Sequence, residues 1–187
     1  IIKKIILFPL ILINYIADFY NMLISFIKPS LGYFWLDRLA EKNKNLTQEV
    51  THKLSNGDEL KLKLYTPNWR CRDGVESFSR KEPETLKWID EYGGDGVLFD
   101  IGANVGLYSL YYAAVKKSKV YAFEPSVFNL ALLAKNISIN NLSHLVQIIT
   151  NPISKENKFA DFSLSMLEEG GTISSFGVEF GHDGKPL

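Results

Sequence analysis

The sequence contains almost no cysteine and has no excess of either charge. Its one cysteine, Cys71, cannot form an internal disulfide, which excludes a secreted disulfide scaffold, and we expect a free thiol near a turn. Lys plus Arg and Asp plus Glu number 21 each, so the formal net charge is zero. Proteins that bind nucleic acid usually carry a basic excess, so we expect no nucleic-acid partner, although the charge balance leaves a local basic patch open.

Patterns typical of metal sites and phosphate loops are also missing. His52, His144 and His182 lie far apart, with no Cys or His neighbour at ligand spacing, so we expect no metal site. The absence of a Gly-Lys-Ser/Thr loop argues against an ATPase or GTPase. What is present is the composition of a folded protein, with 46% apolar and 22% charged residues over a length of 187.

Residues 1–28 are strongly apolar but lack a long uncharged run. The longest run, residues 5–17, is shorter than the roughly 20 residues that a membrane span needs. The polar residues share one helical stripe: Asn14, Asp18, Asn21 and Ser25. This pattern predicts an amphipathic helix. It leaves open a membrane-surface role, packing on protein, and a span or signal segment. We expect a cytoplasmic chain, with peripheral membrane contact through residues 1–28 as one alternative.

The chain divides into three predicted regions. These are an apolar helix with its connector (1–46), a β-hairpin lead-in (47–80) and a larger α/β domain (81–187). In the lead-in, two β-rich runs, 47–54 and 59–65, flank Asn56-Gly57, a pair typical of tight hairpin turns. Residues 66–80 are predicted to form a loop.

Strands and helices alternate in the third region. A helix is predicted at 82–92, followed by strands at 97–101, 119–123 and 145–150 and intervening helices at 105–115 and 126–139. This alternation predicts a parallel sheet covered on both faces. The signal weakens afterwards, with a strand at 159–166 and a loop or hairpin at 170–187.

A candidate ligand site follows the first predicted strand of this region. Asp100 ends the strand, and Gly102 and Gly106 lie in the turn that opens the next helix. Open α/β sheets bind ligands at the carboxyl ends of their strands, where glycines allow close backbone approach. Glu124 ends the second strand, 24 residues after Asp100, where a carboxylate commonly holds ribose hydroxyls.

The residue at position 104 discriminates between nucleoside cofactors. The dinucleotide fingerprint Gly-x-Gly-x-x-Gly requires glycine where Asn104 stands, which disfavours a dinucleotide or nucleotide-sugar oxidoreductase. S-adenosylmethionine has ribose, adenine and an amino-acid tail but no phosphate. The pattern Asp-x-Gly-x-Asn-x-Gly with a strand-end Glu fits that cofactor.

The runs LFDIGANVGLYSLYYA and VYAFEPSVFNLALLAKNISINNL resemble the FkbM family of methyltransferases. The upstream KEPETLKWID and the later Asn151-Pro-Ile-Ser resemble further parts of that family, so the likeness covers about residues 68–180. It implies an α/β fold, a Rossmann-like class I methyltransferase three-layer sandwich that uses S-adenosylmethionine. Here that fold is expected to be incomplete at the C-terminus and extended by the N-terminal helix and hairpin.

The resemblance also implies which residues bind the cofactor and what they methylate. The acceptor is expected to be a hydroxyl of a sugar or other small molecule. The cofactor's methionine end and ribose are assigned to Asp100, Gly102, Ala103, Asn104, Gly106 and Glu124. Pro125 and Ser126 would flank the adenine, which Asn151 would approach, while Glu82 and Thr85 would lie near the amino acid.

The catalytic base cannot be assigned from the sequence. His182, Asp161 and Glu179 are weak candidates without support from spacing, and the family's downstream acidic block is missing, so we expect a fragment of a longer protein. A catalytically silent binding or scaffold module on the same fold stays open as the alternative, because a fold does not establish activity.

Overall fold

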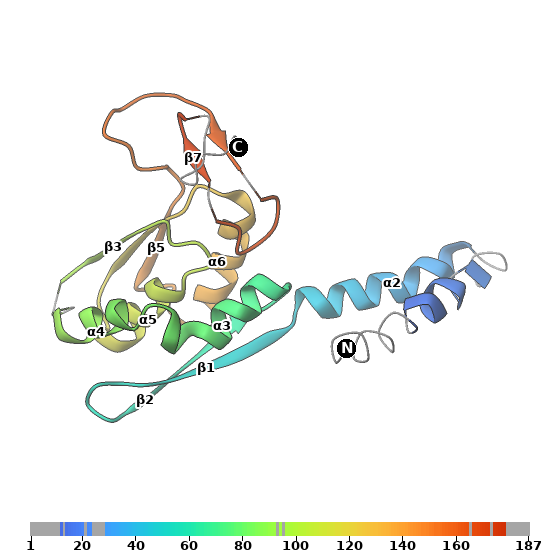
Figure 1. Cartoon of the computed structure of the whole chain (residues 1–187), viewed down its shortest axis with the longest axis horizontal. Coiled ribbons are helices and arrows are strands. Elements are labelled where there is room, and N and C mark those ends of the chain that lie inside the picture. The colour runs from blue at the N-terminus through green and yellow to red at the C-terminus, as the bar shows by residue number, and fades with distance from the viewer. Residues whose placement is uncertain are drawn as a thin grey trace, which may run out of the picture. The chain divides into compact units, whose positions relative to one another are not determined.

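The computed structural model describes residues 12, 14–20, 22–23, 29–92, 94, 96–164, 166–172 and 174–178. The chain forms two compact units, Ile1–Asn45 and Leu46–Leu187 (Figure 1). In the first unit, residues 14–20 are helical and helix α2 covers Pro29–Lys44. The predicted stripe lies partly outside the described residues. None of the helices in the described part of the chain has the length and hydropathy that a membrane crossing requires.

The second unit begins with the predicted hairpin. Strands β1 (Thr47–Lys53) and β2 (Glu59–Tyr65) pair antiparallel, and Gly57 in the turn has a φ of +92°, which glycine adopts at little cost. Val50, Leu62 and Leu64 point from the hairpin into the core. The hairpin belongs to the same compact unit as the sheet that follows it. The proposed boundary at residue 80 stays a prediction.

The prediction of a loop over residues 66–80 was wrong. Helix α3 spans Trp69–Lys81, and the Asn68 side chain caps it by accepting a hydrogen bond of 3.0 Å from the Cys71 backbone N–H. Cys71, Val75 and Phe78 form its buried face, although the helix is polar on average. Tertiary packing of these residues outweighs the weak helical signal of the sequence.

Three short parallel strands form the central sheet in the order β3-β4-β5. They are β3 (Leu98–Ile101), β4 (Val120–Phe123) and β5 (Val146–Ile149), close to the predicted ranges. Parallel strands of one sheet end at the same edge, so Ile101, Phe123 and Ile149, which pair in register, lie side by side. The residues that follow them therefore converge on one site.

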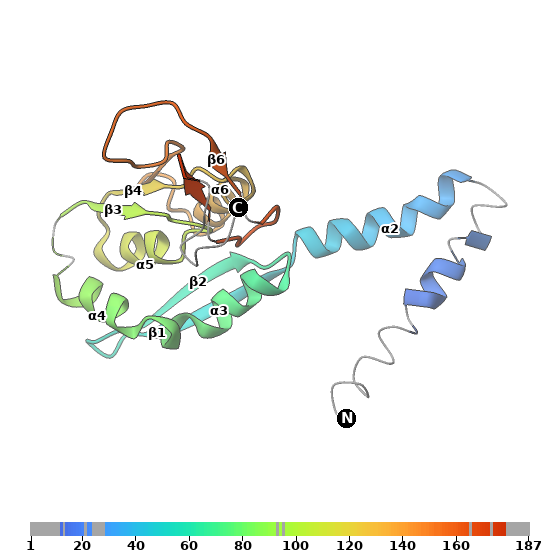
Figure 2. The same cartoon turned by 45° about the horizontal axis from the view of Figure 1, so that its top comes forward.

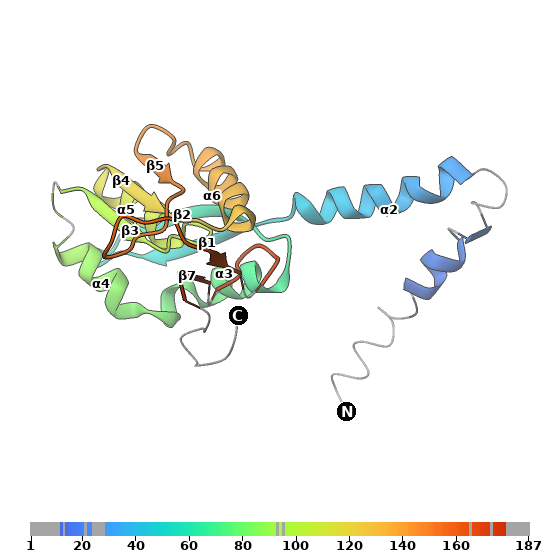
Figure 3. The ribbon, with the colours of Figure 1, turned by 90° about the horizontal axis from the view of Figure 1, so that it is seen from above.

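Helices α4 (Pro83–Tyr92), α5 (Leu107–Lys116) and α6 (Val127–Ile139) connect and cover these elements. Helix α5 lies between the parallel sheet and the hairpin (Figure 2), and α6 contacts both β5 and β2 (Figure 3). The expectation that both sheet faces would be covered is not met in the described residues. Phe99 and Ile101 on the opposite face are 60% and 65% exposed.

The polypeptide after β5 contains little regular structure. The strand expected over 159–166 is reduced to β6 (Phe162–Ser163), which pairs antiparallel with β7 (Ser175–Phe176). The loop or hairpin expected over 170–187 lies partly outside the described residues, and the strand in its described part, β7, pairs with β6. Between them, residues 166–172 return to the carboxyl edge of the parallel sheet, which brings them to the candidate site.

A carboxylate network joins α4 and α5 to the hairpin turn. Asp90 accepts hydrogen bonds of 2.7 Å from both the Tyr111 and the Ser55 hydroxyls. Burial alone would raise the pKa of Asp90, but these hydrogen bonds outweigh it and hold the pKa below its usual value. The network fixes the hairpin against the helices on which the site rests.

We expect Tyr111→Phe to lower the free energy of unfolding at pH 7 by about 1–2 kcal/mol, because a hydrogen bond to a charged group is lost. The pKa of Asp90 is lower in the folded state, so its contribution is present above the unfolded pKa and lost as pH falls through the folded pKa. In urea unfolding, the difference in unfolding free energy between the wild type and Tyr111→Phe should therefore become smaller below about pH 4. The control is Tyr121→Phe. If the stability loss of Tyr111→Phe did not depend on pH, its hydroxyl would not be stabilising the charged Asp90 carboxylate.

Candidate functional site

The turn between β3 and α5 has a backbone that few residue types can adopt. Gly102, Asn104 and Gly106 have φ angles of +84°, +52° and +93°. A side chain at Gly102 would meet no atom within 4 Å, whereas a Cβ at Gly106 would lie 2.5 Å from Leu133 Cδ1. Gly102 therefore leaves space toward the site, and Gly106 allows α5 to pack on α6.

All five backbone N–H groups from Gly102 to Gly106 donate within the protein. Those of Gly102 and Ala103 share the Phe123 carbonyl, each at 2.9 Å, and that of Gly106 reaches the Ala103 carbonyl at 2.8 Å. The Asn104 N–H donates to Glu124, and the Val105 N–H donates to the Asn104 side-chain oxygen at 2.8 Å. Because all five N–H groups are already hydrogen-bonded, the turn offers no free N–H group to a phosphate.

Glu124 is buried, with 5% of its surface exposed, and its carboxylate is fixed by the backbone. Its Oε2 accepts from the Asn104 N–H and its Oε1 from the Ser126 N–H, both at 2.8 Å. A carboxylate has about four acceptor positions, so about two are left for a ligand. The arrangement positions a rigid acceptor pair at the end of β4.

Asp100 lies near the end of β3, the strand that pairs with β4. It accepts a hydrogen bond from the Ser109 hydroxyl, and burial raises the pKa of Asp100, opposed only in part by the bonds from Ser109. Tyr108 lies beside it. Burial and the neighbouring negative charge of Glu82 raise the pKa of Tyr108. Both Asp100 and Tyr108 line a pocket, described below.

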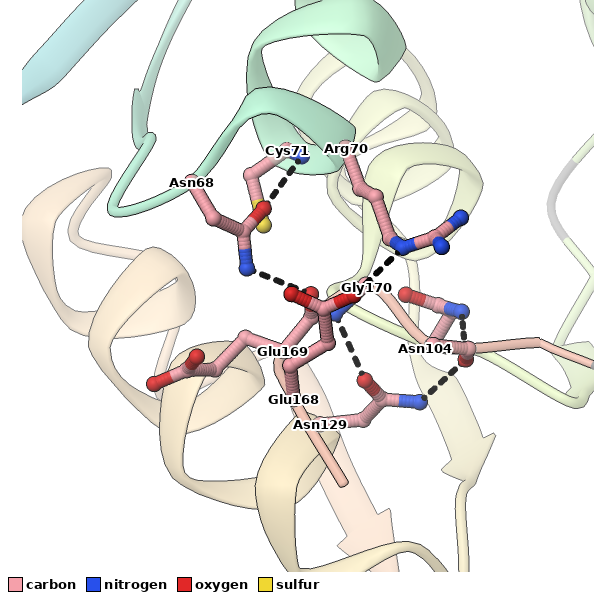
Figure 4. Close-up of polar contacts among 9 residues, drawn as sticks. Asn68, Arg70, Cys71, Asn104, Asn129, Glu168, Glu169 and Gly170 are labelled. Carbon is pink, nitrogen blue, oxygen red and sulfur yellow. Dashed lines mark hydrogen bonds and ion pairs between the residues drawn. The ribbon is translucent and has the colours of Figure 1, made fainter. Parts of the chain in front are cut away.

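Residues 168–171, which we name the strap, cross the turn after β3 (Figure 4). Asn129 holds the strap from α6: its side chain accepts from the Gly170 N–H at 2.9 Å and donates to the Gly171 carbonyl at 3.1 Å. The Asn104 side chain donates to the same carbonyl at 2.9 Å. The strap is thereby tied directly to the turn that carries the candidate site.

Helix α3 holds the other side of the strap (Figure 4). Asn68 donates to the Glu169 carbonyl at 2.8 Å, and Arg70 forms an ion pair of 2.7 Å with Glu168. Gly170 approaches Cys71 so closely that a Cβ there would lie 3.2 Å from the sulfur. Burial, with the charges of Glu169 and Glu168, raises the pKa of Cys71 to about 11, so this thiol stays protonated and is no nucleophile.

Two adjoining pockets open where β3 and β4 end, and they share Gly102, Asn104 and Thr172. The first, which we name the Glu124 pocket, has a volume of about 340 Å³, within the range of small-molecule sites. The second, the Asp100 pocket, has a volume of about 230 Å³. The two pockets are therefore neighbours around the turn between β3 and α5.

The structure brings most of the predicted site residues together. The Glu124 pocket is lined by Gly102, Asn104, Glu124, Pro125 and Asn151, and the Asp100 pocket by Glu82, Asp100, Gly102, Ala103 and Asn104. Gly106 and Ser126 line neither pocket: Gly106 serves helix packing, and Ser126 is buried and orients Glu124 through its N–H. Thr85 lies on α4, 3.4 Å from Glu82.

The candidate bases gain no support from the geometry. Asp161 is exposed and lines neither pocket. His182 and Glu179 lie outside the described residues. Within the described part of the chain, no group of His, Cys, Asp and Glu side chains could hold a metal ion.

Several lining residues were not predicted from the sequence. They include Asn129, which fixes the strap, and Lys81, Arg70 and Tyr108 in the Asp100 pocket. Arg70 and Lys81 lie on the unpredicted helix α3, and the role of Asn129 depends on the return of the strap. The pair Gly170-Gly171 was the one local signal of a close backbone approach in this region.

We expect Asn129→Ala to release the strap, because two buried hydrogen bonds to its backbone are lost. The check is limited proteolysis with a glutamate-specific protease, followed by mass spectrometry. Cleavage after Glu168 and Glu169 should accelerate about tenfold or more. Asn157→Ala, at an exposed loop position, is the matched control, and equal rates in both variants would show that Asn129 does not hold the strap.

The fold and the two pockets place a glycine turn after one parallel strand and a carboxylate after the next, the position at which open α/β sheets bind their ligands. No family model matches the chain. The chain is 28% identical, over 158 residues, to the tRNA (guanine(37)-N(1))-methyltransferase Trm5b of Methanocaldococcus jannaschii. That alignment covers 76% of this chain and 43% of the relative, so the chain spans less than half of that protein's length.

A solved structure from Pyrococcus horikoshii, described as a transferase, matches with 22% identity and a TM-score of 0.36, covering 56% of this chain and 36% of that one. The chain is thus a distant relative of a methyltransferase, and its α/β architecture with a parallel sheet agrees with the predicted fold class in outline. Membership of the FkbM family is not shown.

The similarity to a tRNA methyltransferase corrects one expectation. Zero net charge led us to expect no nucleic-acid partner, and the resemblance to the FkbM family led us to expect a sugar-like acceptor. Net charge sums over the whole chain, whereas contact with nucleic acid needs only a local cationic surface. The charge balance was therefore not a sound ground for that exclusion.

Proposed function

We propose that this chain is the cofactor-binding part of an S-adenosylmethionine-dependent methyltransferase. The observation that supports this proposal most strongly is the buried Glu124 carboxylate. It lines the Glu124 pocket and is held by the Asn104 and Ser126 N–H groups. The similarity to a methyltransferase and the resemblance of about residues 68–180 to the FkbM family support the same activity. The alternative is a silent binding module, which would bind cofactor without turnover.

The residues present fit this cofactor better than a dinucleotide. Because every N–H group from Gly102 to Gly106 is already committed, a pyrophosphate would find no donors in the turn. The free acceptor positions of Glu124 suit two ribose hydroxyls, and Pro125 and Asn151 line the adjoining space for a base. Asp100 and Glu82 provide negative charge in the second pocket for an ammonium group.

When bound, the cofactor supplies a sulfonium methyl, which is already a good electrophile. The protein's main contribution is then to orient the acceptor in line with that methyl and to exclude water. The strap, fixed by Asn129 and Asn104, forms a wall beside both pockets and performs the second role.

We propose RNA as the acceptor, because the relative from Methanocaldococcus jannaschii is a tRNA methyltransferase. The test incubates the chain with radiolabelled cofactor and tRNA transcripts, with protein-free and heat-denatured controls. Label in tRNA would support transfer. Cofactor binding without label in tRNA would reject this acceptor and favour the silent module.

The cofactor assignment itself is tested by isothermal titration with S-adenosylhomocysteine, with NAD as the control ligand. We expect one site for S-adenosylhomocysteine and no heat of binding for NAD. Binding of NAD alone would reject the assignment in favour of an oxidoreductase.

A further inference from the structure

The Asp100 pocket contains charges of both signs, and the sequence had predicted its carboxylates but not its cations. Its lining includes the carboxylates of Glu82 and Asp100 and the cations of Lys81 and Arg70. Arg70 is engaged with Glu168 at 2.7 Å and stacks over Trp69 at 4.6 Å. Lys81, in contrast, forms no ion pair or hydrogen bond with the part of the chain that the structure describes.

Lys81 and Glu82 lie at the corner between two helices. Lys81 is the last residue of α3, and Glu82 is its C-cap with a non-helical backbone, directly before α4. These two adjacent residues of opposite charge therefore line the same pocket. Tyr108 from α5 lines the same pocket as Glu82.

This arrangement matches the chemistry of a zwitterion. An α-amino acid carries an ammonium and a carboxylate on one carbon, so a site for it needs an acceptor and a cation close together. Glu82 and Asp100 provide the acceptors. Lys81 provides a compact, rotatable cation at the same pocket.

We propose that Lys81 is a specificity-determining residue that binds the carboxylate of the cofactor's amino-acid tail, while Glu82 binds its ammonium group. This inference rests on the proposed function, because it places the amino-acid end of the cofactor in the Asp100 pocket. It adds a residue that selects for a ligand with an intact carboxylate.

The experiment is isothermal titration of wild-type chain, Lys81→Met, Glu82→Gln and Lys87→Met with three ligands. These are S-adenosylhomocysteine, its decarboxylated analogue and 5′-methylthioadenosine, which lacks the amino acid. Lys87 is a matched control, because it is exposed on α4, pairs with Glu91 at 3.6 Å and lines neither pocket.

We expect Lys81→Met to weaken S-adenosylhomocysteine about fivefold and to leave the decarboxylated analogue unchanged, as suits a partly exposed charge pair. Glu82→Gln should weaken both ligands and spare 5′-methylthioadenosine. Unchanged binding of S-adenosylhomocysteine to Lys81→Met, or equal losses for all three ligands, would overturn the proposal. Wild-type chain that binds none of the ligands would reject the proposed function instead.

Discussion

Glu124→Ala is expected to reduce the affinity for S-adenosylhomocysteine about a hundredfold. The carboxylate is the acceptor pair at the end of β4, and loss of two charge-assisted hydrogen bonds to ribose costs about 1.5 kcal/mol or more each. The variant also leaves the Asn104 and Ser126 N–H groups without their acceptor, which loosens the turn. Isothermal titration beside thermal unfolding measures both effects.

Glu124→Gln separates binding from folding. Glutamine has nearly the same shape, but it keeps one carbonyl acceptor and adds a donor, so one N–H group stays paired and ribose recognition is weakened. We expect a loss of about tenfold in affinity with a smaller change in stability. If folded Glu124→Ala bound S-adenosylhomocysteine as tightly as the wild type does, the ligand would have to bind elsewhere.

Gly106→Ala is expected to lower the free energy of unfolding by about 3 kcal/mol. The substitution combines two costs: a φ of +93°, which strains a residue with a side chain, and a Cβ placed 2.5 Å from Leu133 Cδ1. Helix α5 would have to move away from α6, which disturbs the turn between β3 and α5. Denaturant unfolding followed by circular dichroism provides the measurement.

Gly57→Ala isolates the first of these costs. Gly57 has a nearly identical φ of +92°, but a side chain there would meet nothing within 4 Å. We expect a loss of only about 1 kcal/mol from backbone strain. If both alanine variants lost the same free energy of unfolding, the close packing of α5 on α6 at Gly106 would contribute nothing measurable to stability.

The sequence predicted the elements whose signal is local. The strands β3, β4 and β5 are short apolar runs bounded by turns, and their helices have clear periodicity, so both were found near their true bounds. The convergence of Asp100, Gly102, Asn104 and Glu124 also followed, because parallel strands end at one edge.

The missed features depend on contacts distant in sequence. Helix α3 is polar on average, and burial of Cys71, Val75 and Phe78 against the rest of the unit stabilises it. The strap is fixed by Asn129 and Asn68, which lie about 40 and 100 residues before it, and no local pattern records such pairs. The Lys81 position in the pocket follows from the unpredicted α3.

The central claim is that the two pockets at the ends of β3 and β4 hold one cofactor. Its most direct test is a titration of ¹⁵N-labelled chain with S-adenosylhomocysteine, followed by amide chemical shifts. Shifts should concentrate in residues 100–106, 124–129 and 168–172, with the β1–β2 hairpin turn unaffected. Shifts confined to other surfaces, or no shift in a well-dispersed spectrum, would contradict the account.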